Sequence, residues 1–320
     1  YVNQKSNDAL HTPYAPKNAK NLSKLTKFLL EEEIKLPKIL TGNYKVKLGN
    51  QLSPSTEETR QACKKNYSNL YNNHNSKFLA EIVDEAEGET VKPKENLKIG
   101  LVYCGRQAPG GNNVVHGLLE FKKRNNNVKL FGFLFGTLGM FNQSYIEITE
   151  ENFALYKNQG GFDFLGRSVD KIRSEEELEK TKNACEALDL DGLILVGATH
   201  TLTDSLLLSE YFLSKKVKTS VVAVPCTVDG NIHHPLFETT VGFDTASKVY
   251  SQLIGNIMTD SASATKYWYL IRLMGRDPSH LVLECALQTH PNYVIISEEC
   301  SNRGQNLDDI VNDICDVIVE

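Results

Sequence analysis

Apolar runs alternate with amphipathic stretches from Lys98 onward. The runs are nearly continuous in Val, Ile, Leu and Phe, which is typical of parallel strands buried on both faces. The stretches between them carry apolar residues at helical spacing. Strands are predicted at 98–105, 128–136, 190–200 and 219–227, and helices at 113–123, 174–188, 202–216 and 239–263. This order predicts an α/β fold with a doubly wound parallel sheet.

A second series of the same kind begins near Lys266. It predicts strands at 267–275 and 292–299, with helices at 278–289 and 307–320. The last helix has no following strand against which to bury its apolar face. We therefore expect two doubly wound parallel-sheet domains, a first at 97–265 and a second at 266–320 that is truncated.

Residues 1–96 show a different pattern, with helices predicted at 22–40 and 55–73 and no strands. Ser55 is the expected N-cap of the second helix, with Glu58 at the capping-box position. Ser174 and Glu177 are expected to form the same motif at the start of 174–188. We predict a helical N-terminal extension that is attached to the main body and has no core of its own.

Composition narrows the class of protein. A net charge of −5 and a hydrophobic content of 41% suit a globular protein with no general attraction to nucleic acid or membranes. The seven cysteines are dispersed without metal-ligand spacing, which favours a reduced, cytoplasmic protein. No apolar run reaches the ~18 residues of a membrane span.

A glycine-rich loop, "YCGRQAPGGNNVVHGL", joins the first predicted strand to its helix. Backbone N–H groups and a helix N-terminus at such a loop favour an anion such as a phosphate. The candidate residues are Gly105, Arg106, Gly110 and Gly111. Glycines also serve tight turns, so the loop by itself supports both interpretations.

Polar residues follow later strands at the edge where open α/β sheets bind their ligands. In "VPCTVDGNI", Asp229 is either a turn-forming residue or a general base. In "RLMGRDPSH", Arg272, Arg276 and His280 surround a glycine turn and suit a phosphate or sugar, or simply lie at the surface. Glu298, at the end of the next predicted strand, is a sugar ligand or a solvated residue.

Together these segments resemble the phosphofructokinase family, in its long plant-type branch that mostly uses pyrophosphate. The resemblance covers residues 96–320 and rests on "KIGLVYCGRQAPGGNNV", "GGFDFLGRSVDKI", "LDGLILVGATH", "VPCTVDGNI", "TTVGFDTASKVYSQLIGNIMTDS", "RLMGRDPSHLVLECALQTHPN" and "IISEE". It implies phosphoryl transfer to the 1-hydroxyl of fructose 6-phosphate in glycolysis, with Mg²⁺ and either ATP or pyrophosphate. Apicomplexan members of this branch fuse two such halves, and the Asn/Lys-rich extension is compatible with that origin.

The resemblance implies that the acceptor side of the site is kept. Thr227 and Asp229 match the threonine and base aspartate of the family's "PKTIDGD" motif. Met274, Gly275 and Arg276 match its sugar-phosphate motif "MGR". Glu298 matches its sugar-binding glutamate.

The donor side differs from the family at several positions. Arg106 fills a glycine position of the "SGGQAPGG" loop, and Val169 stands where an arginine faces the donor. Thr199 and His200 replace the metal-binding carboxylates of "GGDDS". Cys226 replaces the donor lysine, and Asn231 replaces the second aspartate of "PKTIDGD".

These changes predict a catalytically degenerate, regulatory-type half that binds no metal of its own. One preorganised charge stabiliser is commonly worth ~10²–10³ in rate, so one surviving base does not replace several. The expected ligands are fructose 6-phosphate or a fructose bisphosphate effector, and the expected partner is a competent half in a homo-oligomer, a hetero-oligomer or a fused chain. The alternatives are an active kinase in which Arg106 replaces the lysine, and a scaffold that binds no sugar.

Overall fold

The computed structural model describes residues 22–32, 45–51, 56–73, 78–83, 96–106, 108–125, 127–232, 240–275 and 278–319. The chain divides into two compact units, one made of residues 1–107 and 111–224 and the other of residues 108–110 and 225–320. The domain boundaries after residues 96 and 265 stay a prediction.

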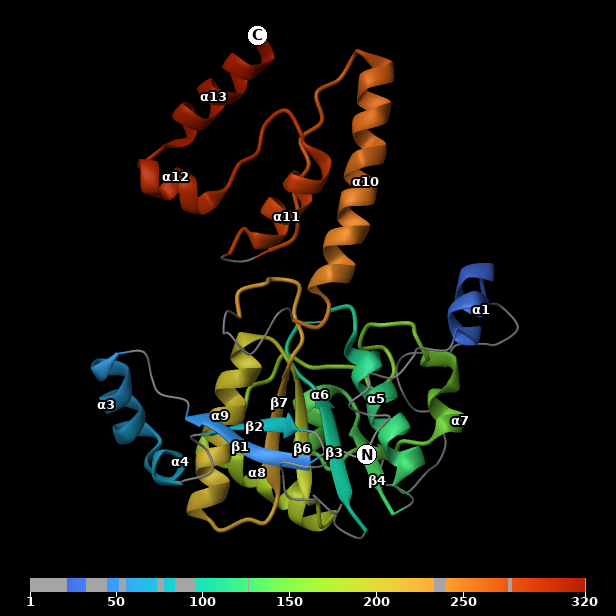
Figure 1. Ribbon diagram of the computed structural model, residues 1–320, viewed down its shortest axis with the longest axis vertical. Coiled ribbons are helices and arrows are strands. Elements are labelled where there is room, and N and C mark those ends of the chain that lie inside the picture. The colour runs from blue at the N-terminus through green and yellow to red at the C-terminus, as the bar shows by residue number, and fades with distance from the viewer. Residues whose placement is uncertain are drawn as a thin grey trace. The chain divides into compact units, whose positions relative to one another are not determined.

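The first unit is built on a five-stranded sheet with strand order β5-β4-β3-β6-β7 (Figure 1). Its strands are β3 (Lys98–Tyr103), β4 (Lys129–Phe133), β5 (Tyr145–Glu147), β6 (Gly192–Gly197) and β7 (Ser220–Pro225). The central strand β3 runs parallel to both β4 and β6. The prediction of a parallel α/β sheet is confirmed. The sequence pattern missed β5, an antiparallel edge strand of three residues that is too short to show alternation.

Helices cover both faces of this sheet, because successive strand residues point to opposite sides. On one face, Val102 of β3 and Cys104, which follows this strand, join a core with side chains from α6 (Gly136–Phe141), α8 (Glu175–Ala187) and α9 (Thr199–Ser214). On the other face, the Tyr103 hydroxyl donates to Asn112 of α5 (Gly111–Arg124) over 2.9 Å. The sheet is therefore doubly wound, as predicted.

Helix caps can be compared with the predicted ones directly. Ser174 accepts from the backbone of Glu177, whose carboxylate accepts in return from Ser174, so this capping box is confirmed. Ser55 was the wrong choice for the helix α3 (Glu57–Asn66). Its N-cap is Thr56, whose hydroxyl accepts from the Thr59 backbone N–H at 3.2 Å.

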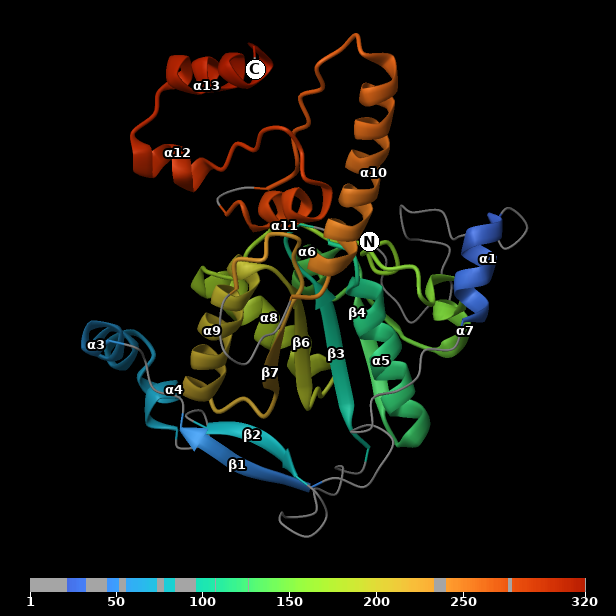
Figure 2. The ribbon, with the colours of Figure 1, turned by 45° about the horizontal axis from the view of Figure 1, so that its top comes forward.

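The N-terminal extension contains strands as well as helices. The helices are α1 (Lys24–Glu31), α3 and α4 (Ser68–Asn72), and β1 (Lys45–Gln51) pairs antiparallel with β2 (Phe78–Val83) (Figure 2). The expectation that residues 1–96 hold no strands was wrong. Pairing between segments so far apart in sequence leaves little local signal, and neither strand alternates strictly.

Two side chains of the first unit fasten this extension. The Glu210 carboxylate of α9 accepts from the backbone N–H groups of Asn69 and Leu70 at 2.9 and 2.8 Å, and from the Asn69 amide at 2.7 Å. The Asn158 amide donates to the carbonyls of Leu29 and Glu32 at the end of α1. These contacts supply the partners that helix ends lack, which short helices need to persist in water.

The second unit is helical in the part of it that the structure describes. It comprises α10 (Phe243–Ala264), α11 (His280–Thr289), α12 (Ser297–Arg303) and α13 (Leu307–Val319), with a small core of Ala246, Ile254, Leu281 and Cys285. The strands predicted at 267–275 and 292–299 are wrong for this structure. Both segments are irregular up to α12, and Trp268 and Leu270 are 66% and 86% exposed. A strand needs neighbouring N–H and C=O groups, and the described residues of this unit offer no paired strand.

The hydrogen bonds that Glu210 accepts predict that α4 is released when this carboxylate is removed. Burial alone raises the pKa of Glu210, but the donors on Asn69 and Leu70 outweigh it and lower the pKa. Glu210→Ala should release α4 at a cost of about 1–2 kcal/mol, with faster amide exchange at Leu70. In the wild type, this stabilisation is complete above the unfolded pKa of the carboxyl and is lost as the pH falls through the folded one. Glu186→Ala, on the exposed side of α8, is the matched control; equal exchange in the two variants would contradict the assignment.

Candidate functional site

The carboxyl ends of β3 and β6 bring together the first group of predicted site residues. Gly105 follows β3 with φ +69°, a conformation that side chains disfavour. Its carbonyl accepts from the Arg167 guanidinium at 3.0 Å. A Cβ added at Gly105 would lie 3.7 Å from the Thr201 hydroxyl, so the loop after β3 and the start of α9 are neighbours. Arg106 is exposed beside them.

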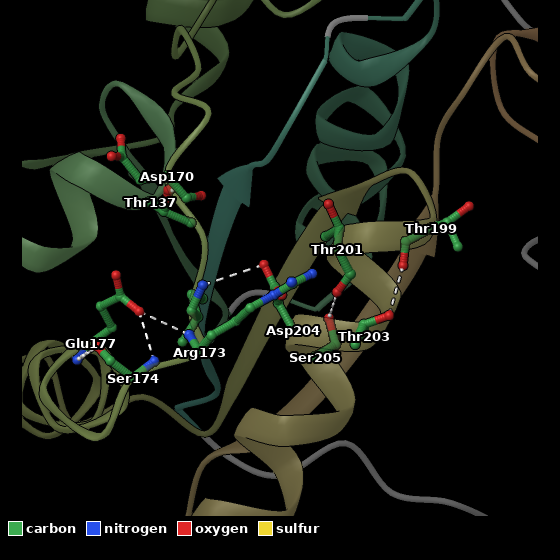
Figure 3. A network of polar contacts seen from close by, with 11 residues as sticks. Thr137, Asp170, Arg173, Ser174, Glu177, Thr199, Thr201, Thr203, Asp204 and Ser205 are labelled. Carbon is green, nitrogen blue, oxygen red and sulfur yellow. Dashed lines mark hydrogen bonds and ion pairs between the residues drawn. The ribbon is translucent and has the colours of Figure 1, made fainter. Parts of the chain in front are cut away.

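The start of α9 carries no acidic side chain. Thr199 and His200 are exposed in its first turn, whereas Thr201 is buried. The hydroxyls of Thr203 and Ser205 donate to the carbonyls of Thr199 and Thr201, so they serve the helix itself (Figure 3). Within the described residues, no group of three or more His, Cys, Asp or Glu side chains is arranged to hold a metal ion. This turn offers N–H groups and hydroxyls for an anion, but no carboxylate for Mg²⁺.

A buried carboxylate, Asp204, holds the neighbouring loop at residues 168–173. It is 4% exposed, and its two oxygens accept from the Ile172 backbone N–H at 3.3 Å and from the Arg173 Nε at 3.1 Å (Figure 3). The sequence analysis did not select Asp204. Its position on the apolar side of α9, beside Leu208 and Phe212, was the available signal, because a buried carboxylate requires partners.

The same loop is held from its other side by α6. The Thr137 hydroxyl lies 2.8 Å from the Ser168 hydroxyl and donates to the Asp170 carbonyl, also over 2.8 Å. Val169 lies between Ser168 and Asp170, the two residues that Thr137 contacts, and is 70% exposed. The loop therefore presents an apolar side chain where the family resemblance implies an arginine.

In the second unit, Thr227 builds the turn that carries Asp229. Thr227 is buried; its hydroxyl accepts from the Asp229 backbone N–H at 3.1 Å, and its carbonyl accepts from the Thr240 hydroxyl. A Cβ on Gly230, which has φ +63°, would meet the Cβ of His280 at 3.3 Å. The Asp229 turn therefore lies against the start of α11. The partly exposed Asp229 carboxylate is compatible with both a turn role and a base role.

Cys226 is fully buried, with its thiol 3.9 Å from the Pro109 carbonyl. Burial raises the pKa of this thiol to about 12, so it is neutral near pH 7. Close by, Gly110 has φ +102°, and a Cβ there would come within 2.5 Å of Val241. In the first unit, Gly111 begins α5, where a Cβ would overlap Phe162. Cys226 therefore contributes no positive charge where the resemblance implies a lysine.

The remaining predicted residues belong to the same unit as α11. Met274 is exposed and Gly275 lies near the Pro278 carbonyl, whereas Arg276 falls outside the described residues. Glu298 accepts from the Ser279 backbone N–H over 2.8 Å. Asn231 is exposed after the Asp229 turn.

Comparison with known proteins places these features in a family. Residues 98–318 match the family model described as Phosphofructokinase. The chain is 40% identical over 302 residues to the pyrophosphate–fructose 6-phosphate 1-phosphotransferase subunit alpha of Solanum tuberosum, covering 93% of this chain and 49% of that protein. It is 37% identical over 308 residues to subunit beta of the same enzyme from Ricinus communis, covering 96% and 54%. The chain thus spans about half the length of these curated relatives.

A solved structure supports the fold. Phosphofructokinase from Saccharomyces cerevisiae superposes with a TM-score of 0.59 at 20% identity, over 69% of this chain and 29% of that one. In the described part of the chain, no helix has both the length and the apolar character that a membrane crossing requires.

Removal of the Asp204 carboxylate should loosen the loop at residues 168–173. Asp204→Ala leaves the Ile172 N–H without its partner in a buried place, which costs about 1–3 kcal/mol and should speed exchange of that amide. Asp204→Asn keeps an acceptor for Ile172 and should recover most of the protection. Thr203→Ala, on the exposed side of the same helix, is the control. Unchanged exchange at Ile172 in Asp204→Ala would contradict this assignment.

Cysteine labelling tests the state of Cys226. Native protein treated with iodoacetamide at pH 8 should be alkylated at Cys63, Cys300 and Cys315, which are at least partly exposed. Cys226 should react only after unfolding, because its thiol is buried and protonated. Peptide mass spectrometry measures both. Rapid native labelling of Cys226 would show that this position is open and charged.

Proposed function

Since this chain belongs to the phosphofructokinase family, we propose that it is a catalytically degenerate, regulatory-type half of a 6-phosphofructokinase that still binds a phosphorylated fructose. The whole protein would transfer a phosphoryl group to the 1-hydroxyl of fructose 6-phosphate in the cytoplasm. Its donor, ATP or pyrophosphate with Mg²⁺, would be handled by a competent partner half.

The observation that carries this proposal is the lack of carboxylates and of a lysine at the described positions 199, 200 and 226, although Arg106 and Arg167 remain on the neighbouring loops. Thr199 and His200 stand at the start of α9 without a carboxylate, Val169 is exposed on its loop, and Cys226 is a buried neutral thiol. These residues do not fit a Mg²⁺–phosphate group, since hard cations take oxygen ligands such as carboxylates and phosphates need countercharge.

The sizes of the expected changes in rate favour a half without activity over a slow enzyme. Each missing stabiliser costs ~10²–10³ in rate, and general-base catalysis by Asp229 returns ~10²–10⁴ at most. Losses within one site are not additive, but several absent groups still outweigh one that remains.

The acceptor side supports retained binding. The Asp229 turn, Met274, Gly275 and Glu298 belong to one unit, and the Asp229 turn contacts the start of α11. The relatives named subunit alpha and subunit beta are consistent with pairing of unequal halves. The partner of this half would be a second phosphofructokinase chain, in a homo- or hetero-oligomer or fused to this one.

A binding and turnover experiment tests the proposal. Fructose 6-phosphate at about 100 times its Kd should stabilise the chain by ~2.7 kcal/mol in thermal unfolding, while turnover with ATP or pyrophosphate stays at background. Arg276→Ala should remove the shift, because a phosphate loses its forked contact. Arg124→Ala, at the exposed end of α5, is the matched control.

Two outcomes favour the other functions. Turnover at a rate typical of kinases, ~1–100 per second, would show an active enzyme with an unusual donor site in which Arg106 supplies the charge. No shift with any fructose phosphate would show a scaffold without sugar binding.

A further inference from the structure

His116 of α5 lies in a seam of the first unit, the contact between α5 and α7 (Glu150–Phe153). Its side chain is 15% exposed, and its ring stacks on Phe153, with 6.3 Å between the ring centroids and 26° between the ring planes. Phe153 also stacks on Tyr156 and packs edge-on against Phe164. The imidazole therefore lies against an aromatic cluster with little access to water.

The charged groups that face His116 come from both sides of the seam. On α5, the Glu120 carboxylate lies 3.7 Å from the His116 Nε2, but the Lys123 ammonium already holds this carboxylate at 2.6 Å. Lys123 also lies 3.6 Å from Glu150 of α7, and Lys157 is near enough to repel a positive charge on His116. Among these side chains, histidine is the only type that ordinarily changes its charge between about pH 5 and pH 8.

Burial lowers the pKa of His116 below its ordinary value. Glu120 acts in the opposite direction, whereas Lys157 and Lys123 add to the lowering. The folded seam therefore binds a proton less well than the open one does. Its stabilisation is complete above the unfolded pKa of about 6.5 and is lost as the pH falls through the folded pKa.

The seam also carries the attachment of α1. Directly after Phe153 the chain forms η4 (Ala154–Tyr156), against which α1 packs. Two residues later, the Asn158 amide donates to the carbonyls of Leu29 and Glu32 at 2.8 and 2.9 Å. Because η4 begins at the residue after Phe153, a displacement of this ring from the imidazole would reach both contacts of α1.

We propose that His116 makes the attachment of α1 sensitive to acid: a proton on the imidazole opens the contact between α5 and α7 and loosens residues 153–158 and α1 with it. The ion pair of Glu120 with Lys123 persists over the same range, because the hydrogen bond from Lys123 lowers the pKa of this carboxyl. Proton binding therefore acts through one stacked imidazole, and the neighbouring ion pair is kept.

Proton binding to His116 can be followed by NMR of the imidazole in the wild-type chain, assigned through its contact with the Phe153 ring. We expect a titration midpoint below ~6.5. Lys157→Met should raise this midpoint, because a repelling charge is removed, and Glu120→Gln should lower it. Lys171→Met, at an exposed lysine elsewhere in the unit, is the matched control and should leave it unchanged. A wild-type midpoint at or above the ordinary value would overturn the proposal.

Amide exchange tests the consequence for α1. After correction for the intrinsic rate, exchange at residues 153–158 and in α1 should be ~3-fold faster or more at about pH 5.5 than at about pH 7.5, while the amides of β6 stay protected. His116→Phe keeps an aromatic ring on Phe153 without a titrating group, so it should remove this difference. No difference in the wild type, or one that persists in His116→Phe or extends to β6, would overturn the proposal. If His116→Phe does not fold, the wild-type midpoint and its change in Lys157→Met still decide.

Discussion

Parallel pairing of β3 with both neighbours decides where the loops of the first unit lie. Leu101 stands opposite Gly132 of β4 on one side and Ile194 of β6 on the other. Because these strands share a direction, the loop after β3 and the turn after β6 emerge at the same edge. The approach is close: a Cβ at Gly197 would lie 2.2 Å from the Thr201 hydroxyl and 2.8 Å from the Cys104 carbonyl. The sheet thus brings these two loops together at one edge.

Polar contacts hold the loop that strand pairing does not fix. The loop at residues 168–173 touches the sheet through a single bridge between Ser168 and Cys104, and it is held by the Thr137 hydroxyl of α6 and by the Asp204 carboxylate of α9. The backbone of this loop is therefore fixed by contacts that do not involve the Val169 side chain. The position of the loop depends on the buried side chains of Thr137 and Asp204, whereas Val169 and Thr199 are exposed. Exposed side chains can therefore change without moving the backbone.

Both units contain buried cysteines whose thiols pack as small apolar groups. In the first, Cys104 and Cys185 pack as small apolar groups, and burial raises the pKa of both thiols. In the second, Cys226 does likewise at a position where the family pattern has a charge. A buried thiol satisfies packing without bringing a charge, so the fold does not depend on a charged side chain at this position. The Glu298 carboxylate, which accepts from the Ser279 backbone N–H, joins the first turn of α12 to the residue that precedes α11.

Features that depend on local pattern could be predicted before the fold was known. The apolar runs predicted β3, β4, β6 and β7, and the spacing of Ser174 and Glu177 predicted a capping box. The altered donor side that the residues at 199, 200 and 226 imply through the family resemblance stays a prediction. The long-range contacts, such as Glu210 with Asn69 and Asp204 with Ile172, became apparent in the folded structure alone, as did the lack of strand pairing at residues 267–275. The reason is physical: a hydrogen bond between distant segments depends on where the fold places both partners, and an apolar run becomes a strand only beside another strand.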